Sequence, residues 1–204
     1  MSDDLGGPVA EGGGKGGAPR RLGRVERREQ ILDSAVRALV RRGGFAATNI
    51  DDVAAESGVT RMILYRHFDS KEDLFRAVLE RAGERLHAAT TLDGGIGEHS
   101  VPGMLSWAAA DPDGFRLLFH HAARDPDYRG EIDELRAALT GTLSTHLGDA
   151  AVGPAWSDWA ASLATTMTIE AIMAWLDAGQ PDPELAAERV MGVIDGVFRS
   201  VGAA

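Results

Sequence analysis

One short segment of the chain gathers side chains that could recognise nucleic acid. Between residues 48 and 68, two short helical patterns meet at Gly58, and the second presents basic, aromatic and thioether groups on its outward side. Guanidinium groups can pair with guanine edges, whereas methionine and tyrosine can touch thymine methyl groups or sugars. His67 and Lys71 can reach phosphates. The outward side comprises Arg61, Met62, Tyr65, Arg66 and His67.

The spacing within this segment predicts a helix-turn-helix. Thr48 is suited to cap the first helix, with Asp51 three residues further on, and Gly58 permits a left-handed backbone at the turn. Thr60 can cap a second helix that runs to about Phe68. Eight residues make a helix roughly 12 Å long, which suits entry into a DNA major groove of similar width.

The elements around this segment are predicted to be helical as well. Apolar residues at helical spacing indicate a helix from Arg27 to the Gly43-Gly44 pair, a longer helix after Ser70, and five more beyond residue 92. No stretch longer than four residues alternates with period two, so we expect an all-α fold of about nine helices. We divide the chain into a Gly-rich, disordered tail (1–23), a three-helix DNA-binding domain (24–85) and a larger helical domain (86–204).

Charge is distributed unevenly along the chain. The formal net charge of −10 would suggest that the protein avoids nucleic acid, but residues 20–85 hold 14 Lys and Arg against 11 Asp and Glu, whereas residues 86–204 hold 6 against 17. Residues 20–42 alone carry an excess of five positive charges. This predicts an arm and first helix that can approach an anion. A solvated helix face without a partner is the alternative.

Several classes of protein are excluded or disfavoured by the sequence. The chain has no cysteine, which excludes disulfides, cysteine-ligated zinc and thiol nucleophiles. It lacks a signal peptide and any uncharged apolar run of roughly 18 residues, so we expect a cytoplasmic protein without a membrane partner. It contains neither G-x-S-x-G nor H-E-x-x-H, so we expect no enzyme and no cofactor. His120 and His121 point about 100° apart on a helix, so we expect no metal site.

A dense set of short motifs carries a family resemblance. The motifs are Gly-Phe at 44–45, Thr-x-Ile at 48–50, Val-Ala at 53–54, Gly-Val-Thr at 58–60, Leu-Tyr-x-His-Phe at 64–68 and Ser-Lys-Glu-x-Leu-Phe at 70–75. Residues 27–85 thereby resemble the DNA-binding domain of the TetR family of transcriptional regulators. Met62 departs from this pattern, since many members have glycine or another small residue there, and its larger side chain limits how closely that turn approaches the groove.

The resemblance implies a sequence-specific regulator. It would be a homodimeric repressor that a small-molecule ligand releases from a palindromic operator in double-stranded DNA. The residues expected to contact DNA are Thr48, Thr60, Arg61, Met62, Ile63, Tyr65, Arg66, His67 and Lys71. A ligand-independent or architectural DNA-binding protein is the alternative, and an enzyme on a helical scaffold has no motif in its favour.

The second half of the chain is expected to dimerise and to hold the ligand. The eighth predicted helix has apolar residues on two sides, and Gly192 and Gly196 would permit close helix contact in the ninth. The alternative is that both helices bury these residues within one monomer. The candidate ligand-binding residues are Met104, Trp107, Phe115, Phe119, His120, Trp159, Leu163, Met167 and Glu170.

Glu170 is the sharpest of these candidates, because it is the only charged residue between Asp158 and Asp177. A carboxylate on an apolar helix stripe is costly to bury unless it is paired. Glu170 could therefore meet a cationic ligand or form an internal ion pair with Arg116 or Arg124.

Overall fold

The structure, a computed structural model, describes residues 23–92, 97, 99–147 and 153–202, so the predicted Gly-rich tail lies outside the described residues except for Gly23. Over the described ranges the chain forms the expected all-α fold with nine α-helices. These are α1 (Arg24–Arg42), α2 (Ile50–Ser57), α3 (Arg61–Tyr65), α4 (Lys71–Thr90), α5 (Ser100–Ala110), α6 (Pro112–Arg116), α7 (Arg129–Leu147), α8 (Pro154–Asp177) and α9 (Pro183–Ser200). A π-helical turn (Leu117–His121) and a 3-10 turn (Ala122–Arg124) follow α6.

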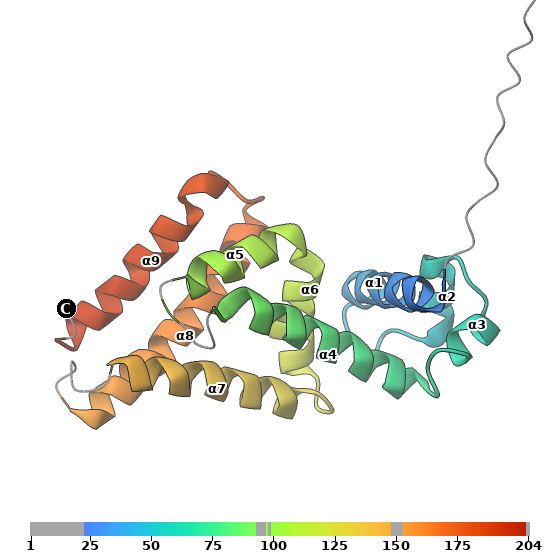
Figure 1. The fold of residues 1–204 in the computed structure, drawn as a ribbon, viewed down its shortest axis with the longest axis horizontal. Coiled ribbons are helices and arrows are strands. Elements are labelled where there is room, and N and C mark those ends of the chain that lie inside the picture. Colours follow the sequence, from blue (N-terminus) through green and yellow to red (C-terminus); the bar gives the residue numbers. More distant parts are fainter. Residues whose placement is uncertain (1–22, 93–96, 98, 148–152, 203–204) are drawn as a thin grey trace, which may run out of the picture.

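The helices form two groups that α4 connects. Figure 1 shows α1, α2 and α3 at one end of the molecule and α5 to α9 at the other, with α4 running from the first group into the second. α4 is continuous from Lys71 to Thr90, so it passes without a break through the predicted boundary between residues 85 and 86. One continuous helix therefore connects the two groups.

Packing also joins the two groups. The Phe45 ring, which follows α1, lies 5.4 Å from the Phe75 ring of α4 and 4.4 Å from the Tyr128 ring, which precedes α7. On another side of α4, Arg85 forms ion pairs with Asp33 of α1 at 3.7 Å and with Asp111 before α6 at 2.7 Å. In addition, one cluster of buried apolar residues extends from α1 to α9.

None of the helices in the described ranges is long and apolar enough to cross a lipid bilayer.

Candidate nucleic-acid interface

The first short helix of the predicted pair begins at a well-formed cap. The Asn49 side chain accepts hydrogen bonds from the backbone N–H groups of Asp51 (2.9 Å) and Asp52 (3.0 Å), and the Asp52 carboxylate accepts one from Asn49 N (2.9 Å). This capping box satisfies N–H groups that have no partner inside the helix. The cap of α2 is therefore Asn49, one residue after the predicted Thr48.

Thr48, the residue predicted as that cap and as a DNA contact, is buried. Its exposed fraction is 1%, and its hydroxyl donates a hydrogen bond of 2.8 Å to the carbonyl of Gly44. Thr48 therefore holds the turn between α1 and α2 together. The prediction that its side chain contacts DNA is wrong, because the side chain faces the core.

The turn follows the predicted pattern, and one side of α3 is buried. Gly58 ends α2 with φ +65°, a left-handed conformation that favours glycine. Thr60 occupies the predicted N-cap position of α3, but its side chain makes no capping hydrogen bond. Leu64 and Phe68 are buried in the core. Ile63, another predicted DNA contact, is half-buried and packs against this core, so only part of its side chain is accessible.

The helix is shorter than expected, since α3 ends at Tyr65 rather than at Phe68. Arg66 and His67 lie in the turn that follows, and the backbone N–H groups of His67 and Phe68 both bond to Leu64 O. This turn brings the two basic side chains next to the start of α4.

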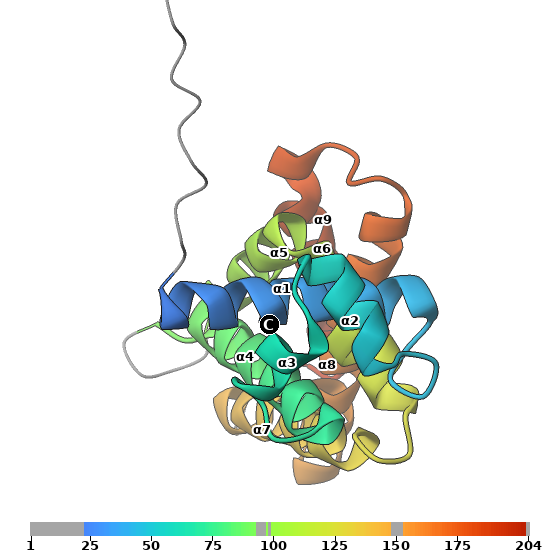
Figure 2. The same cartoon turned by 90° about the vertical axis from the view of Figure 1, so that its right-hand side faces the viewer.

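The outward face of α3 carries the exposed groups that the sequence placed there. Met62 is 67% exposed and Tyr65 47%, and both arginines beside them are exposed as well. Arg66 Nη2 lies 3.8 Å from Met62 Sδ, and Arg61 Nε lies 3.3 Å from the Asp51 carboxylate of α2. Figure 2, which looks at this end of the molecule, shows α3 in front of α1. The face combines hydrogen-bond donors with apolar surface.

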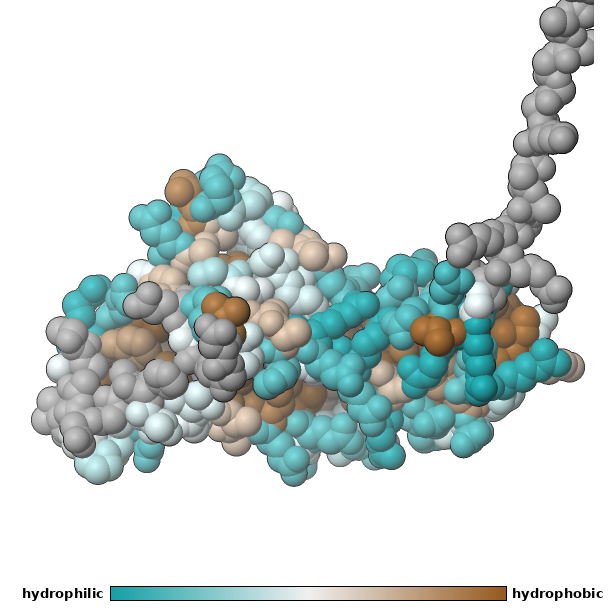
Figure 3. Space-filling view, viewed as in Figure 1, coloured by the Kyte–Doolittle hydropathy of each residue, from teal (hydrophilic) through white to brown (hydrophobic). Residues whose placement is uncertain are grey.

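Basic residues from α1 act on the turn that follows α3. Partial burial, and then the positive charges of Arg24, Arg28 and Arg27, lower the pKa of His67. The first turns of α1 therefore contribute their field to the same region as the α3 side chains. In Figure 3, hydrophilic residues predominate on the visible face of the half that α1 to α4 form, and more apolar surface is visible on the other half.

Two cations at this end rest against aromatic rings. The Arg28 guanidinium lies 5.0 Å from the centroid of the Phe68 ring, and Lys71 Nζ lies 5.3 Å from that of Phe75. Such contacts hold a charged group near the surface while its apolar stem is covered. Lys71 is the first residue of α4, where the positive end of the helix dipole also favours an anion.

The remaining arginines of α1 serve a structural role. Arg37 Nε pairs with Glu56 at 2.8 Å, Arg41 also pairs with Glu56, and Arg42 pairs with Asp52. These contacts fasten α1 to α2. The predicted positive surface of residues 20–42 is therefore reduced, among the described residues, to the first turns of α1, while Arg20 and Arg21 lie outside the described residues.

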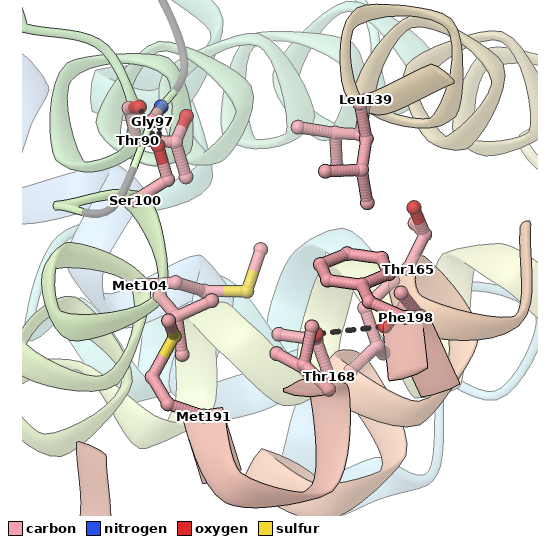
Figure 4. A pocket seen from close by; sticks show the side chains of 14 residues that line it. Thr90, Gly97, Ser100, Met104, Leu139, Thr165, Thr168, Met191 and Phe198 are labelled. Atoms are coloured by element: carbon pink, nitrogen blue, oxygen red, sulfur yellow. Dashed lines mark hydrogen bonds between the residues drawn. The ribbon is translucent and has the colours of Figure 1, made fainter. Parts of the chain in front are cut away.

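The second group of helices surrounds a partly open cavity of about 240 Å³. Its walls come from the end of α4, from α5, α7, α8 and α9, and from Gly97. Figure 4 shows Met104 and Met191 on one side, Phe198 and Thr165 on another, and Leu139 above. Met104 is the only one of the nine predicted ligand-binding residues among those that line it.

The aromatic and histidine candidates lie elsewhere. The ring of half-buried Trp107 is 5.7 Å from that of Phe115, and the Phe115 and Phe119 rings are 4.9 Å apart, so these three belong to the core. His120 is exposed. Trp159 is 46% exposed, with its ring 5.5 Å from that of Trp156.

The prediction of a buried carboxylate at Glu170 is wrong, because α8 turns this residue toward the surface. Arg116 instead pairs with Asp177 at 2.9 Å, and Arg124 donates a hydrogen bond to the carbonyl of His120 at 3.1 Å. Met167 and Leu163 are half-buried beside a small cluster between α8 and α9, outside the cavity.

Sequence reasoning missed the other lining residues, among them Thr90, Ser100, Thr168, Met191 and Phe198. Each lies on an apolar or small-residue face that is typical of ordinary core packing. Only the convergence of five helices makes these faces into a cavity, and no single helical pattern contains that information.

The outer faces of α8 and α9 expose apolar groups. Trp156 is 53% exposed, and Val193 is 40% exposed. On α9, a Cβ built on Gly192 or Gly196 would have no heavy atom within 4 Å, apart from the helix's own nearby backbone, so open space lies over both glycines. These exposed positions on α8 and α9 are together called the α8–α9 face below; they are Trp156, Trp159, Gly192, Val193 and Gly196.

Known proteins resemble the chain in both sequence and fold. The model of bacterial regulatory proteins of the tetR family matches residues 31–78. An uncharacterised HTH-type transcriptional regulator of Mycobacterium tuberculosis is 38% identical over 94 residues, which cover 46% of this chain and 34% of that relative. The HTH-type transcriptional activator FasR of Mycolicibacterium smegmatis is 33% identical over 128 residues, covering 59% of this chain and 58% of FasR. The matches thus span only a third to three-fifths of these relatives.

The fold has solved counterparts. A TetR-like transcriptional regulator from Rhodococcus sp. RHA1 superimposes with a TM-score of 0.73 over 90% of this chain and 100% of that one, at 22% sequence identity. At this identity the likeness establishes the fold. Residues 31–78 thus match the tetR family of bacterial regulatory proteins, within a chain whose fold is that of TetR-like regulators.

Proposed function

We propose that this protein is a cytoplasmic transcriptional regulator that binds double-stranded DNA through α3 and the start of α4, and that it acts by binding rather than by catalysis. The observation that carries the proposal is the exposed α3 face. Arg61, Met62 and Tyr65 project from a helix whose other side is fixed in the core, and Arg66 is exposed in the turn after it. The donors and apolar groups of this face suit base edges in a major groove. Lys71 and the first turns of α1 would contact the flanking phosphates.

The α8–α9 face supports a homodimer. Exposed tryptophans at one end of α8 and two open glycines on α9 would allow a second copy to pack closely against these helices. A two-fold axis there would pair the α3 helices of both subunits. Such a dimer would recognise a palindromic site whose half-sites are about one DNA turn, roughly 34 Å, apart.

The position of the cavity supports control by a small molecule. Thr90, the last residue of α4, lines the cavity, and Lys71, the first residue of the same helix, lies next to the α3 face. A ligand that favours one position of the Thr90 end would shift the separation of the two α3 helices and so change operator affinity. We propose release of a repressor. Because the relative FasR is described as an activator, the sign is an outcome to be measured.

The experiment that tests DNA binding is selection from random double-stranded DNA at low salt. We expect enrichment of two-fold symmetric sequences by the wild type, and none by a variant with Arg61→Ala and Arg66→Ala. Both side chains are exposed, so this variant should keep its fold. An absence of enrichment by the wild type would refute the proposal. Enrichment without symmetry would refute the dimeric arrangement and favour an architectural DNA-binding protein.

A further inference from the structure

The cavity differs from a site built for a charged ligand. Among the described residues that line it, none has an ionisable side chain. Its surface comes mainly from methionine, leucine, isoleucine, valine and phenylalanine side chains. An ion that entered would lose its hydration without gaining an opposite charge from these residues, which is strongly unfavourable.

The hydroxyl groups in the wall add a second restriction, because three of the four already use their hydrogens. The fourth, Thr165 Oγ1, accepts a hydrogen bond from Thr140 Oγ1 at 3.2 Å. Thr90 Oγ1 donates to Leu86 O at 2.9 Å, and Ser100 Oγ donates to Thr90 O at 2.6 Å. Thr168 Oγ1 donates to Ala164 O at 2.7 Å. A hydroxyl has one hydrogen to donate and two lone pairs that accept. These three groups therefore present acceptors to the cavity.

Ser100 has less capacity than the two threonines, since its oxygen already accepts a hydrogen bond from Gly97 N at 2.9 Å. Thr90 and Thr168 thus remain as the better acceptors. Figure 4 shows Thr168 near the Phe198 ring and Thr90 beside Ser100, so the two acceptors come from different parts of the wall. A ligand with an O–H or N–H group can satisfy either, whereas a carboxylate has only acceptor atoms to offer.

Size and flexibility set the remaining limits. At about 20–30 Å³ for each non-hydrogen group, a cavity of about 240 Å³ holds about 8–12 such groups. Met104 and Met191 are flexible side chains that can adapt to an irregular apolar ligand.

We propose that this cavity binds a neutral, mainly hydrocarbon molecule of about ten non-hydrogen atoms whose polar group is a hydrogen-bond donor, such as an alcohol, and that it discriminates against carboxylates and quaternary ammonium ions. The proposal names the ligand class of the regulator proposed above and rests on that function for its biological role. The binding itself is measured on the protein without DNA. A failure of ligand binding is therefore distinguishable from a failure of DNA binding.

The test uses three probes with the same ten-carbon chain: 1-decanol, decanoate and decyltrimethylammonium. Each is titrated into the full chain by calorimetry at pH 7.5, below the concentration at which it aggregates. We expect 1-decanol to bind and both ions to bind at least 100-fold more weakly. Binding of either ion as tight as that of the alcohol would overturn the proposal, and so would the absence of binding by all three.

Two variants of α7 locate the site. Leu139→Trp would fill the cavity, whereas Leu135→Trp adds the same bulk to a half-buried residue of the same helix that packs on the core outside the cavity. We expect Leu139→Trp to weaken 1-decanol binding at least tenfold and Leu135→Trp to leave it within twofold. Melting temperatures of both variants without ligand identify any loss of fold. Equal effects in two folded variants would place the ligand elsewhere.

A third variant tests the hydrogen bond. Thr168→Val keeps the branched shape but removes the acceptor oxygen, so we expect 1-decanol to bind about fivefold more weakly, the equivalent of one net hydrogen bond. Binding of the methyl ether of 1-nonanol, which has no donor, should not change. Equal effects on the alcohol and the ether would refute the proposed role of Thr168.

Discussion

Replacing Lys71 with methionine should weaken DNA binding without unfolding the protein. Lys71 Nζ lies 5.3 Å from the centroid of the Phe75 ring, so its stem passes over that ring. Methionine keeps an unbranched apolar stem at this position and removes only the charge. If Lys71 of each subunit contacts one phosphate, the Lys71→Met dimer loses two phosphate contacts.

The size of the effect follows from counterion release. Each phosphate contact contributes about 0.9 to the slope of log affinity against log salt, so Lys71→Met should reduce that slope by about 1.8 for a dimer. If the variant and the wild type bind equally at 1 M salt, this slope difference gives an affinity loss of roughly 30-fold at 0.15 M salt and roughly 200-fold at 0.05 M. The loss should be the same for all DNA sequences, since phosphates carry no base information.

The assay is fluorescence anisotropy with a selected fragment and an unrelated duplex over a series of salt concentrations. Arg76→Met is the matched control, because Arg76 is an exposed cation on the same helix, with Nε 3.9 Å from Glu131 of α7. We expect the control to keep the wild-type slope. An unchanged slope in Lys71→Met, or an equal loss in the control, would refute the assignment of Lys71 to phosphate.

Three further predictions concern stability and assembly. Asn49→Ala removes the acceptor of two backbone N–H groups and should lower the free energy of unfolding by about 1 kcal/mol in urea titrations, and a change below about 0.3 kcal/mol would count against the capping role. Burial, and then the charge of His120, lower the pKa of His121, so the folded state favours the neutral imidazole. The contribution of this group to stability should be fully present above pH about 6.5 and should be lost as pH falls through the lowered pKa. His121→Asn should lessen this loss in thermal melts. Gly192→Leu should dissociate the dimer in sedimentation experiments, whereas Gly141→Leu, at another open glycine, should not. A Gly192→Leu protein that still forms dimers would place the interface elsewhere.

The helix-turn-helix could be predicted from sequence because its signals are local. Gly43 and Gly58 both adopt the left-handed conformation that ends a helix, and Ser70 caps α4 by accepting a hydrogen bond from Asp73 N. The error at the cap of α2 has a tertiary cause. Thr48 and Asn49 are both good capping residues, and only the burial of Thr48 against the core decides between them.

The cavity could not be predicted in the same way, since its wall consists of residues that are ordinary in any helix core. Met104 is a large apolar residue and so a natural pocket candidate, whereas Thr168 and Ser100 carry no comparable signal. Glu170 is the lone charge of an apolar helix, but the sequence of one helix does not reveal which of its faces stays exposed in the fold. The proposed ligand class therefore rests on how five helices meet around the cavity and on the hydrogen bonds of the residues that line it.

The most direct test of the central proposal is the specificity of DNA binding at physiological salt. A fragment recovered by selection is titrated by anisotropy in competition with unrelated duplex, and the stoichiometry is measured on the same fragment. We expect two chains per site and a preference of at least about 1,000-fold over unrelated DNA, which the double variant at Arg61 and Arg66 should abolish. Equal affinity for both duplexes, or a preference that survives the double variant, would contradict recognition of DNA by α3.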